Sequence, residues 1–204
     1  MTKVISRRER KKAAVRERIL TTAIDLFSRH AFADVTVDQI AEAADIGKGT
    51  VYNYFAAKED IVVAFMANLE AQVQAKLRRF VAAEGPLEAI LSEFIRFQFR
   101  LKKPYFRFVR VFFGQMFLHT EEFLPYMIEM QKEIDPPLGV FFRGLQQRGL
   151  IRAELDVPQL VFTFKTIHLG LTALWAVEGP PFQQTEKTVA HEMKLFCEGL
   201  RAKL

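Results

Sequence analysis

The fold of this chain is decided by residues 36–55, which read TVDQIAEAADIGKGTVYNYF. Apolar and small residues recur here at three- and four-residue steps, which predicts one helix over Val37–Ala44 and another over Lys48–Phe55. Thr36 is placed to N-cap the first helix, because its hydroxyl can accept a hydrogen bond from an otherwise unpaired backbone N–H. The three residues between the helices leave room only for a tight turn. Two short helices joined in this way form a helix-turn-helix.

The side chains of this motif divide into an inner face and an outer face. Ala41 and Ala44 are small enough for the helices to cross closely, and Ile46 supplies an apolar plug from the turn. The second helix then has polar and aromatic side chains left for its outer face, where they can reach DNA phosphates or base edges. At the start of the first helix, a hydroxyl and N-terminal amides favour a phosphate oxygen. We therefore expect DNA contacts from Thr36, Gln39, Lys48, Gly49, Thr50, Tyr52, Asn53 and Tyr54.

Positive charge is concentrated at the N-terminal end of the chain. Residues 1–18 hold eight basic and two acidic side chains, a net charge of +6, and the net charge of +5 for the whole chain leaves −1 for the rest. Nucleic acid is the common partner of such a charge distribution, and Arg16 and the basic residues before it are expected to lie along a groove or backbone. A disordered leader that only aids solubility is the alternative that the sequence leaves open.

The remaining chain predicts helices only, so the expected fold class is all-α with about nine helices. Gly and Pro residues separate the apolar-periodic segments and set their ends. We expect a DNA-binding domain over 1–58, and a second helical domain over 59–204. The helices outside the helix-turn-helix are expected at 16–30, 59–83, 87–101, 104–118, 121–147 with a bend near the prolines at 136 and 137, 157–177 and 182–200.

Phenylalanine is unusually frequent in the second domain, and the chain has 20 in all. Most of these rings are expected to be ordinary core, which is the alternative for each residue taken singly. Together with a few polar groups, however, an aromatic-lined cavity suits an apolar or aromatic effector. The residues expected to line it are Phe65, Phe94, Phe97, Gln98, Phe108, Phe112, Met116, Phe141, His168, Thr172 and Trp175.

The helix expected at 157–177 combines bulky apolar residues with small ones that let helices approach closely. These residues predict a homodimer interface, with packing inside one domain as the alternative. The interface is expected to include Val161, Leu169, Gly170, Ala173 and Leu174.

The motif residues resemble the N-terminal domain of the TetR family of repressors. The resemblance runs through Arg18-Ile19-Leu20 and Leu26-Phe27, the first helix of the motif, and Lys48-Gly49-Thr50-Val51-Tyr52-Asn53-Tyr54-Phe55 with Lys58-Glu59. It implies a two-domain homodimer in which the third helix enters the major groove of operator DNA. It also implies that residues 59–204 form the effector-binding and dimerisation domain. It also implies that Lys58, at the start of the fourth helix, touches phosphate. A small-molecule effector is then expected to prefer a state in which helix four has tilted, so that DNA is released.

Four residues depart from the pattern of this family, and one of them is Ala56, which stands where proline is frequent. Asp45 stands at the position of a turn glycine, and aspartate tolerates a left-handed backbone better than most residues. Gly47 replaces the serine or threonine that caps the recognition helix, so this cap lacks a side-chain acceptor. Asn53 stands where histidine is frequent, and the sequence leaves open whether its amide pairs with adenine or with a phosphate.

Two other classes of function share some of these features. A non-specific nucleoid or architectural DNA-binding protein would also explain the basic N-terminus. An enzyme would need a nucleophile, a metal cluster or paired carboxylates, and none stands out, so no catalytic residue, metal or cofactor is expected. Cys197 is the single cysteine and is expected to be a packed small hydrophobe. The chain starts with charged residues and lacks a long uncharged apolar run, which predicts a soluble, cytoplasmic protein without a membrane partner.

Overall fold

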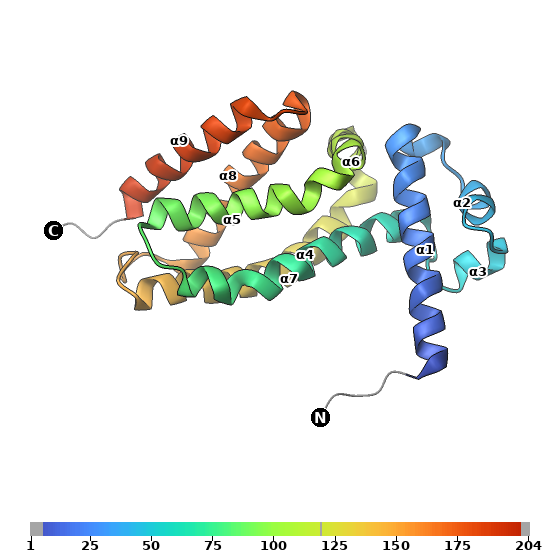
Figure 1. The fold of residues 1–204 in the computed structure, drawn as a ribbon, viewed down its shortest axis with the longest axis horizontal. Coiled ribbons are helices and arrows are strands. Elements are labelled where there is room, and N and C mark those ends of the chain that lie inside the picture. The colour runs from blue at the N-terminus through green and yellow to red at the C-terminus, as the bar shows by residue number, and fades with distance from the viewer. Residues whose placement is uncertain (1–5, 119, 201–204) are drawn as a thin grey trace. The chain divides into compact units, whose positions relative to one another are not determined.

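The structure is a computed structural model that describes residues 6–118 and 120–200, except the side chains of 115–118, 120, 122, 123, 126, 127 and 130. Every regular element in this part of the chain is helical, which confirms the all-α prediction (Figure 1). The elements are α1 (Arg7–Arg29), η1 (Phe32–Asp34), α2 (Val37–Ala43), α3 (Lys48–Tyr52), α4 (Lys58–Ala82), α5 (Leu87–Lys102), η2 (Lys103–Tyr105), α6 (Phe106–Leu118), α7 (Thr120–Gln147), α8 (Val157–Glu178) and α9 (Gln183–Leu200).

The chain forms two compact units. The N unit comprises Met1–Asn68 and Arg107–Phe123, and the C unit comprises Leu69–Phe106 and Leu124–Leu204. The division therefore falls inside α4, which begins in the N unit and ends in the C unit. The domain boundary predicted after residue 58 lies at the start of this helix.

Helix α1 is longer than the sequence predicted, because it begins at Arg7 instead of near Arg16. Its start is fixed by a reciprocal cap: the backbone N–H of Glu9 donates to Ser6 Oγ over 3.2 Å, and the backbone N–H of Ser6 donates to Glu9 Oε2 over 2.8 Å. Such a capping box satisfies N–H groups that have no partner within the helix. The alternative of a disordered leader is thus wrong for residues 7–18, which are helical.

The core of the N unit forms where α1 packs against α2 and α2 packs against α3 (Figure 1). The buried face of α1 repeats at helical spacing, as the sequence predicted. Ile40 and Ala41 of α2 are also buried, as is Ala44, which directly follows α2. The residues that α1 buries are Ile19, Leu20, Ala23, Ile24 and Phe27.

The C unit is organised around phenylalanine rings that come from several helices. Phe94 of α5 has no exposed surface, and its ring centroid lies 5.1 Å from that of Phe80, 5.2 Å from that of Phe141 and 5.8 Å from that of Phe164. These partners belong to α4, α7 and α8, so one side chain joins four helices. Helix α9 covers α5 and α8 (Figure 1).

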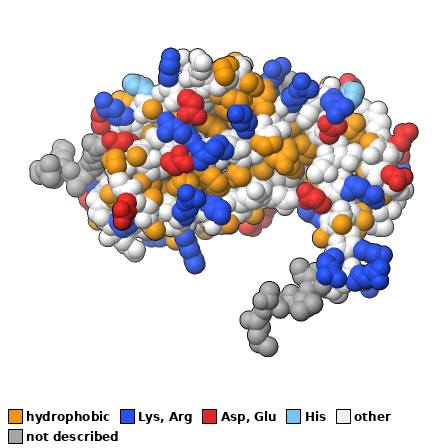
Figure 2. Space-filling model, viewed as in Figure 1, with side chains coloured by type: hydrophobic (Ala, Val, Ile, Leu, Met, Phe, Trp, Pro, Cys, Tyr) orange, Lys and Arg blue, Asp and Glu red, His pale blue; other side chains and the backbone are white. Residues whose placement is uncertain are grey.

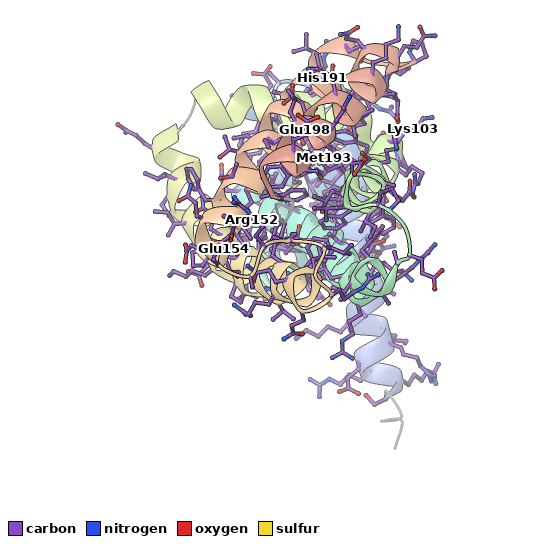
Figure 3. The ribbon with its side chains drawn as sticks, turned by 90° about the vertical axis from the view of Figure 1, so that its left-hand side faces the viewer. Lys103, Arg152, Glu154, His191, Met193 and Glu198 are labelled. Atoms are coloured by element: carbon purple, nitrogen blue, oxygen red, sulfur yellow. The ribbon has the colours of Figure 1, made fainter. Side chains whose placement is uncertain are left out.

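The loop between α7 and α8 is tied to the end of α9. The backbone N–H of Arg152 donates to the carbonyl of Leu200 over 3.1 Å, and Arg152 Nη2 donates to the carbonyl of Gly199 over 3.0 Å. Figure 3 labels Arg152 beside Glu154, whose carboxylate lies 3.8 Å from Arg152 Nε. These contacts fix the C-terminal end of α9 on the C unit.

Candidate DNA-binding interface and effector region

The first helix of the motif, α2, is capped as the sequence predicted. The backbone N–H of Gln39 donates to Thr36 Oγ1 over 3.2 Å, and the backbone N–H of Thr36 donates to Gln39 Oε1 over 2.8 Å. Both side-chain oxygens are therefore occupied by the cap. The amide nitrogen of Gln39 and the exposed position of both residues keep them available for the phosphate contact that remains predicted.

The turn between α2 and α3 adopts the left-handed conformation expected at its first residue. Asp45 has φ 51°, and the backbone N–H of Ile46 donates to the carbonyl of Ala41 over 3.0 Å. Aspartate is one of the few non-glycine residues that adopt this conformation at moderate cost. The substitution of the family's glycine thus leaves the turn intact.

Helix α3 is shorter than predicted, because it ends at Tyr52 and not at Phe55. Gly47 caps its N-terminus with extended backbone and no side-chain hydrogen bond, as the sequence indicated. Beyond the helix, the N–H groups of Tyr54 and Phe55 donate to the carbonyl of Val51 over 2.9 and 3.0 Å. Val51 and Phe55 are 1% and 5% exposed, so the same two side chains anchor the segment although the helix has ended.

The outer face of α3 presents most of the predicted DNA-contacting side chains. Lys48, Gly49, Tyr52 and Asn53 are exposed, and Tyr52 exposes 48% of its surface although it is a large aromatic residue. Thr50 and Tyr54 are half-buried. A tyrosine left in solvent at this position is available for phosphate or base contacts.

Lys48 is linked to α2 by an ion pair. Its ammonium lies 2.8 Å from Asp38 Oδ2, and this hydrogen bond raises the pKa of Lys48 above its ordinary value. Both side chains are more than half exposed, with 51% and 64% of their surface in solvent. Ion pairs in such positions contribute little to stability. A DNA phosphate can therefore compete with Asp38 for this ammonium.

The N unit also contains a hollow that the sequence did not reveal. It has a volume of about 430 Å³ and lies between the first turns of α1 and the end of α3. Figure 2 shows the Lys and Arg side chains that gather at this end of α1. The hollow is lined by Arg8, Lys11, Lys12, Val15, Thr50, Asn53 and Tyr54.

Lys58 has a structural role that the sequence could not show. Its ammonium donates to the carbonyls of Phe32, Ala33 and Val35 over 2.7, 3.3 and 3.0 Å, and it lies 4.5 Å from the centroid of the Phe32 ring. An ammonium has three N–H donors, and these bonds use all three. The phosphate contact of Lys58 that the family resemblance implies stays a prediction, and the structure gives this group other partners.

The eleven residues proposed for an effector cavity fall into two groups. Phe65, Phe108 and Phe112 belong to the N unit, where the Phe108 centroid lies 5.2 Å from that of Phe65 and 5.9 Å from that of Phe112. The side chain of Met116 lies outside the described residues. The C unit holds the rest, which are Phe94, Phe97, Gln98, Phe141, His168, Thr172 and Trp175. In the C unit all except Phe97 and His168 are buried, and those two are half-buried.

One end of this C-unit group is polar. Lys102 Nζ lies 3.4 Å from His168 Nε2, and the hydroxyl of Thr172 donates to the backbone carbonyl of His168 over 2.8 Å. The Phe99 ring stacks on His168 with centroids 6.2 Å apart, and on Trp175 at 5.7 Å. The sequence analysis did not single out Lys102, because nothing in a run of basic residues at a helix end marks one of them as half-buried among aromatic rings.

Burial shapes the charges at this polar end. It lowers the pKa of Lys102 to about 8, against the opposing charge of Glu70. It also raises the pKa of Glu70 and lowers that of His168, which the nearby charge of Lys102 lowers further. His168 is therefore neutral at pH 7, and Lys102 is a cation held in aromatic surroundings.

The predicted dimer residues on α8 are divided between the surface and the interior. Val161 is 4% exposed and packs inside the C unit, so the structure does not place it on an interaction surface. Leu169 and Gly170 are exposed, and Ala173 and Leu174 are half-buried. Two side chains that the sequence analysis did not include, Phe162 and Val177, are 64% and 81% exposed and continue the same apolar strip.

Helix α8 is also long and apolar enough to cross a membrane by length and composition alone. Its mean hydropathy is 1.5 over the most apolar window, and 39% of that window is buried. Core helices of soluble proteins meet the same criteria, so this finding is weak evidence for a membrane. It does show that α8 leaves much apolar surface without cover from its own chain.

Comparison with known proteins agrees with this geometry. Residues 19–65 match the model of the family described as bacterial regulatory proteins, tetR family. The HTH-type transcriptional regulator RutR of Escherichia coli K12 is 26% identical over 206 aligned positions, which cover 98% of this chain and 96% of RutR.

Two solved structures have the same fold. The fatty acid degradation regulator FadR of Bacillus halodurans matches with a TM-score of 0.76 and 19% identity, over 93% of this chain and 97% of that one. FadR of Thermus thermophilus, a TetR-family repressor in complex with lauroyl-CoA, matches with a TM-score of 0.69 and 19% identity, over 93% and 96%. The matched segment contains α2, α3 and the start of α4, and the likeness to RutR extends through both units. Residues 19–65 of this chain therefore form a DNA-binding domain of the tetR family of bacterial regulatory proteins.

Proposed function

We propose that this protein is a dimeric, cytoplasmic repressor that binds operator DNA through α2 and α3 and leaves it when an apolar effector binds the C unit. The observation that carries the DNA-binding part is the outer face of α3. Its side chains offer an ammonium, hydroxyls and an amide, while Val51 and Phe55 hold the segment on the core. A rigid helix that presents such groups suits the reading of base edges in a major groove.

Selection of bound duplexes from a random pool tests this part. A sequence-specific repressor enriches a two-fold symmetric site, because each protomer reads one half-site and the half-sites lie about 34–36 Å apart. Tyr52→Ala should weaken binding to the enriched site. Arg29→Ala, which removes a surface ion pair with Asp25 on α1, serves as the control and should leave binding unchanged. A non-specific architectural protein would enrich no sequence, and random competitor DNA would then displace the selected duplex.

The exposed strip on α8 supports the dimer. Phe162, Leu169 and Val177 follow helical spacing and expose large apolar surface. A contiguous apolar surface of this kind marks an interaction site in a soluble protein. The Val177→Asp variant should sediment as a monomer, because dimerisation would bury the new carboxylate in the interface. Val140→Asp on α7 is the matched control, because Val140 is a 62% exposed valine outside the strip; a dimer with both variants would argue against this interface.

The effector part is supported by the aromatic interior and the polar end of the C unit. A long apolar ligand can pack among the rings, and Lys102 and His168 can pair with its polar or anionic head. The lauroyl-CoA complex of the Thermus thermophilus relative has a ligand of this kind, an acyl chain on a polar carrier.

Coupling between effector and DNA is proposed to run through α4, because this one helix belongs to both units. A ligand shifts the equilibrium only if it binds one state of that helix more tightly. Lauroyl-CoA is the probe: its binding is followed by the fluorescence of Trp175, the single tryptophan, and operator release by anisotropy. Saturable binding that leaves operator affinity unchanged would contradict this mechanism.

A further inference from the structure

Lys102 is the last residue of α5, a position from which a lysine usually extends into solvent. Its side chain is instead half-buried, and its ammonium lies 6.0 Å from the centroid of the Phe99 ring, one turn earlier on the same helix. Among the residues that the structure describes, no carboxylate forms an ion pair with Lys102. Lysine is rarely buried without such a partner. Charge pairing within the fold therefore does not explain the position of this side chain.

The polar group in contact with Lys102 is the imidazole of His168 on α8. Lys102 Nζ lies 3.4 Å from His168 Nε2, and an ammonium can only donate, so Nε2 is the acceptor. The single proton of the neutral imidazole is then on Nδ1, and the lone pair of Nε2 faces the lysine nitrogen. Burial and the charge of Lys102 both lower the pKa of His168, which keeps Nε2 unprotonated. The fold thus places a proton acceptor beside a lysine amine.

Aromatic rings surround this pair. Phe99 stacks on His168 and on Trp175, and Phe182 stacks on Trp175 with ring centroids 4.9 Å apart. Trp175 and Phe182 are buried, whereas Lys102 and His168 keep part of their surface in solvent. A small molecule can therefore reach the amine, and its apolar part has ring faces beside it to pack on.

The same surroundings make Lys102 a stronger nucleophile at pH 7 than an exposed lysine. Burial lowers the pKa of Lys102 to about 8, against the charge of Glu70 on α4. About a tenth of Lys102 is then free amine at pH 7, on the order of a hundred times the fraction for a lysine with the ordinary pKa near 10.4. Desolvated lysines of this kind form Schiff bases with carbonyl compounds. Glu70 and His168 are the titratable side chains from neighbouring helices that interact with Lys102.

The charges of the pocket wall also favour a neutral ligand. Lys102 is a single cation, and the carboxylate of Glu70 opposes it. An anionic head would gain little net attraction here and would lose its hydration, whereas an aldehyde carries no charge to bury.

We propose that Lys102 captures apolar aldehydes as a Schiff base, with His168 as the proton acceptor. The lysine nitrogen attacks the carbonyl carbon, an N–C bond forms, and the electron pair of the carbonyl π bond moves to oxygen. One proton passes from nitrogen to Nε2 of His168 and on to that oxygen, which gives a carbinolamine. The hydroxyl then takes the second nitrogen proton and leaves as water, so that amine and aldehyde become imine and water without oxidation or reduction. This proposal rests on the effector role proposed for the C unit, and it names the class of effector.

Reductive trapping tests the capture. The full-length protein is incubated with octanal and sodium cyanoborohydride, which reduces an imine to a stable secondary amine, and fragment mass spectra locate the octyl group. Lys102→Arg keeps the positive charge but cannot form an imine. Lys103→Arg is the matched control, because Lys103 is the next residue and is exposed (Figure 3). Circular dichroism compares the folding of both variants with that of the wild type.

We expect octanal to label Lys102 at least tenfold faster than Lys103 at pH 7, and this fast labelling should be lost in Lys102→Arg and kept in Lys103→Arg. The ratio of the two rates should fall by tenfold or more from pH 7 to pH 10, because Lys102 is already deprotonated above pH 8 while exposed lysines are still losing protons. His168→Phe keeps a ring against Phe99 and should slow labelling of Lys102 by about a hundredfold, since it removes the proton acceptor.

Equal labelling of Lys102 and Lys103, a ratio independent of pH, fast labelling in Lys102→Arg, or an unchanged rate in His168→Phe would each overturn the proposal. The proposed function fails in a different way. Release of the operator by lauroyl-CoA without capture of octanal would overturn the Schiff base alone. Capture of octanal by Lys102 in a protein whose operator affinity responds to neither compound would overturn the effector role.

Discussion

Replacement of Lys58 by methionine removes the ammonium that holds the segment before α2. The three carbonyls it binds belong to Phe32, Ala33 and Val35, and two of these hydrogen bonds are partly buried. Hydrogen bonds to charged groups contribute about 1.5–3 kcal/mol each. The lower figure for the two partly buried bonds gives about 3 kcal/mol. The contact with the Phe32 ring adds about 0.5–1 kcal/mol, and packing of the methionine side chain offsets a similar amount.

The expected result is a free energy of unfolding lower by about 3 kcal/mol. For a chain of this size, that corresponds to a melting temperature lower by about 6–12 °C. Thermal unfolding followed by circular dichroism measures it. Lys58→Arg is the companion variant: it keeps the charge but not the compact three-donor geometry, and should lose less stability than Lys58→Met.

The second measurement separates the structural role of Lys58 from a phosphate contact. If the ammonium stays on the carbonyls in the complex, the salt dependence of operator binding by Lys58→Met, taken well below its melting temperature, keeps the wild-type slope. A slope lower by about 0.9 with unchanged stability would refute our reasoning, and would show that Lys58 leaves the carbonyls for a phosphate.

Three further outcomes follow from the structure. Gly47→Ser should stabilise the protein by a few tenths of a kcal/mol in thermal unfolding, since Gly47 has φ −69° and an added hydroxyl can cap α3; a lower melting temperature would contradict this. Gly144→Ala should lower the free energy of unfolding by about 1–3 kcal/mol, because a Cβ would lie 2.8 Å from Val81 Cγ1; Val81→Ala in the same chain should restore most of it in urea unfolding. The pKa of Lys102 is about 8 in the folded protein and about 10.4 when unfolded. The unfolded chain therefore binds more protons between these values, and wild-type stability should rise from pH 8 to 10, whereas urea midpoints of Lys102→Met should lack this contribution.

The sequence predicted the helices of the C unit well because their ends carry strong local signals. Gly85-Pro86 separates α4 from α5, and Gly179, with φ 71°, ends α8. Helix α3 was predicted too long because Val51 and Phe55 are both buried at helical spacing, and a turn after Tyr52 preserves that spacing. The early start of α1 could have been read from Ser6 and Glu9, since serine followed three residues later by glutamate is the signature of a capping box.

Candidate functional residues could be predicted from the sequence only where they all lie on the same helix. The outer face of α3 could be inferred from the polar residues left after its core positions were assigned. The hollow could not, because it requires knowing that Lys11 and Asn53 face each other from separate helices. Likewise, Lys58 finds its partners more than twenty positions away in the chain, at Phe32 and Val35. Periodicity says which face of a helix is buried, but not which distant groups meet it.

The position of the unit boundary inside α4 has a consequence for protein engineering. A chimera that joins this DNA-binding unit to the sensor of another regulator must be spliced within a continuous helix, near Asn68 and Leu69. Each residue inserted there turns everything downstream by about 100°, because the helix has 3.6 residues per turn. Splices that add or remove seven residues change the phase by only about 20°. Functional chimeras should therefore recur at such lengths, whatever the sequence at the junction.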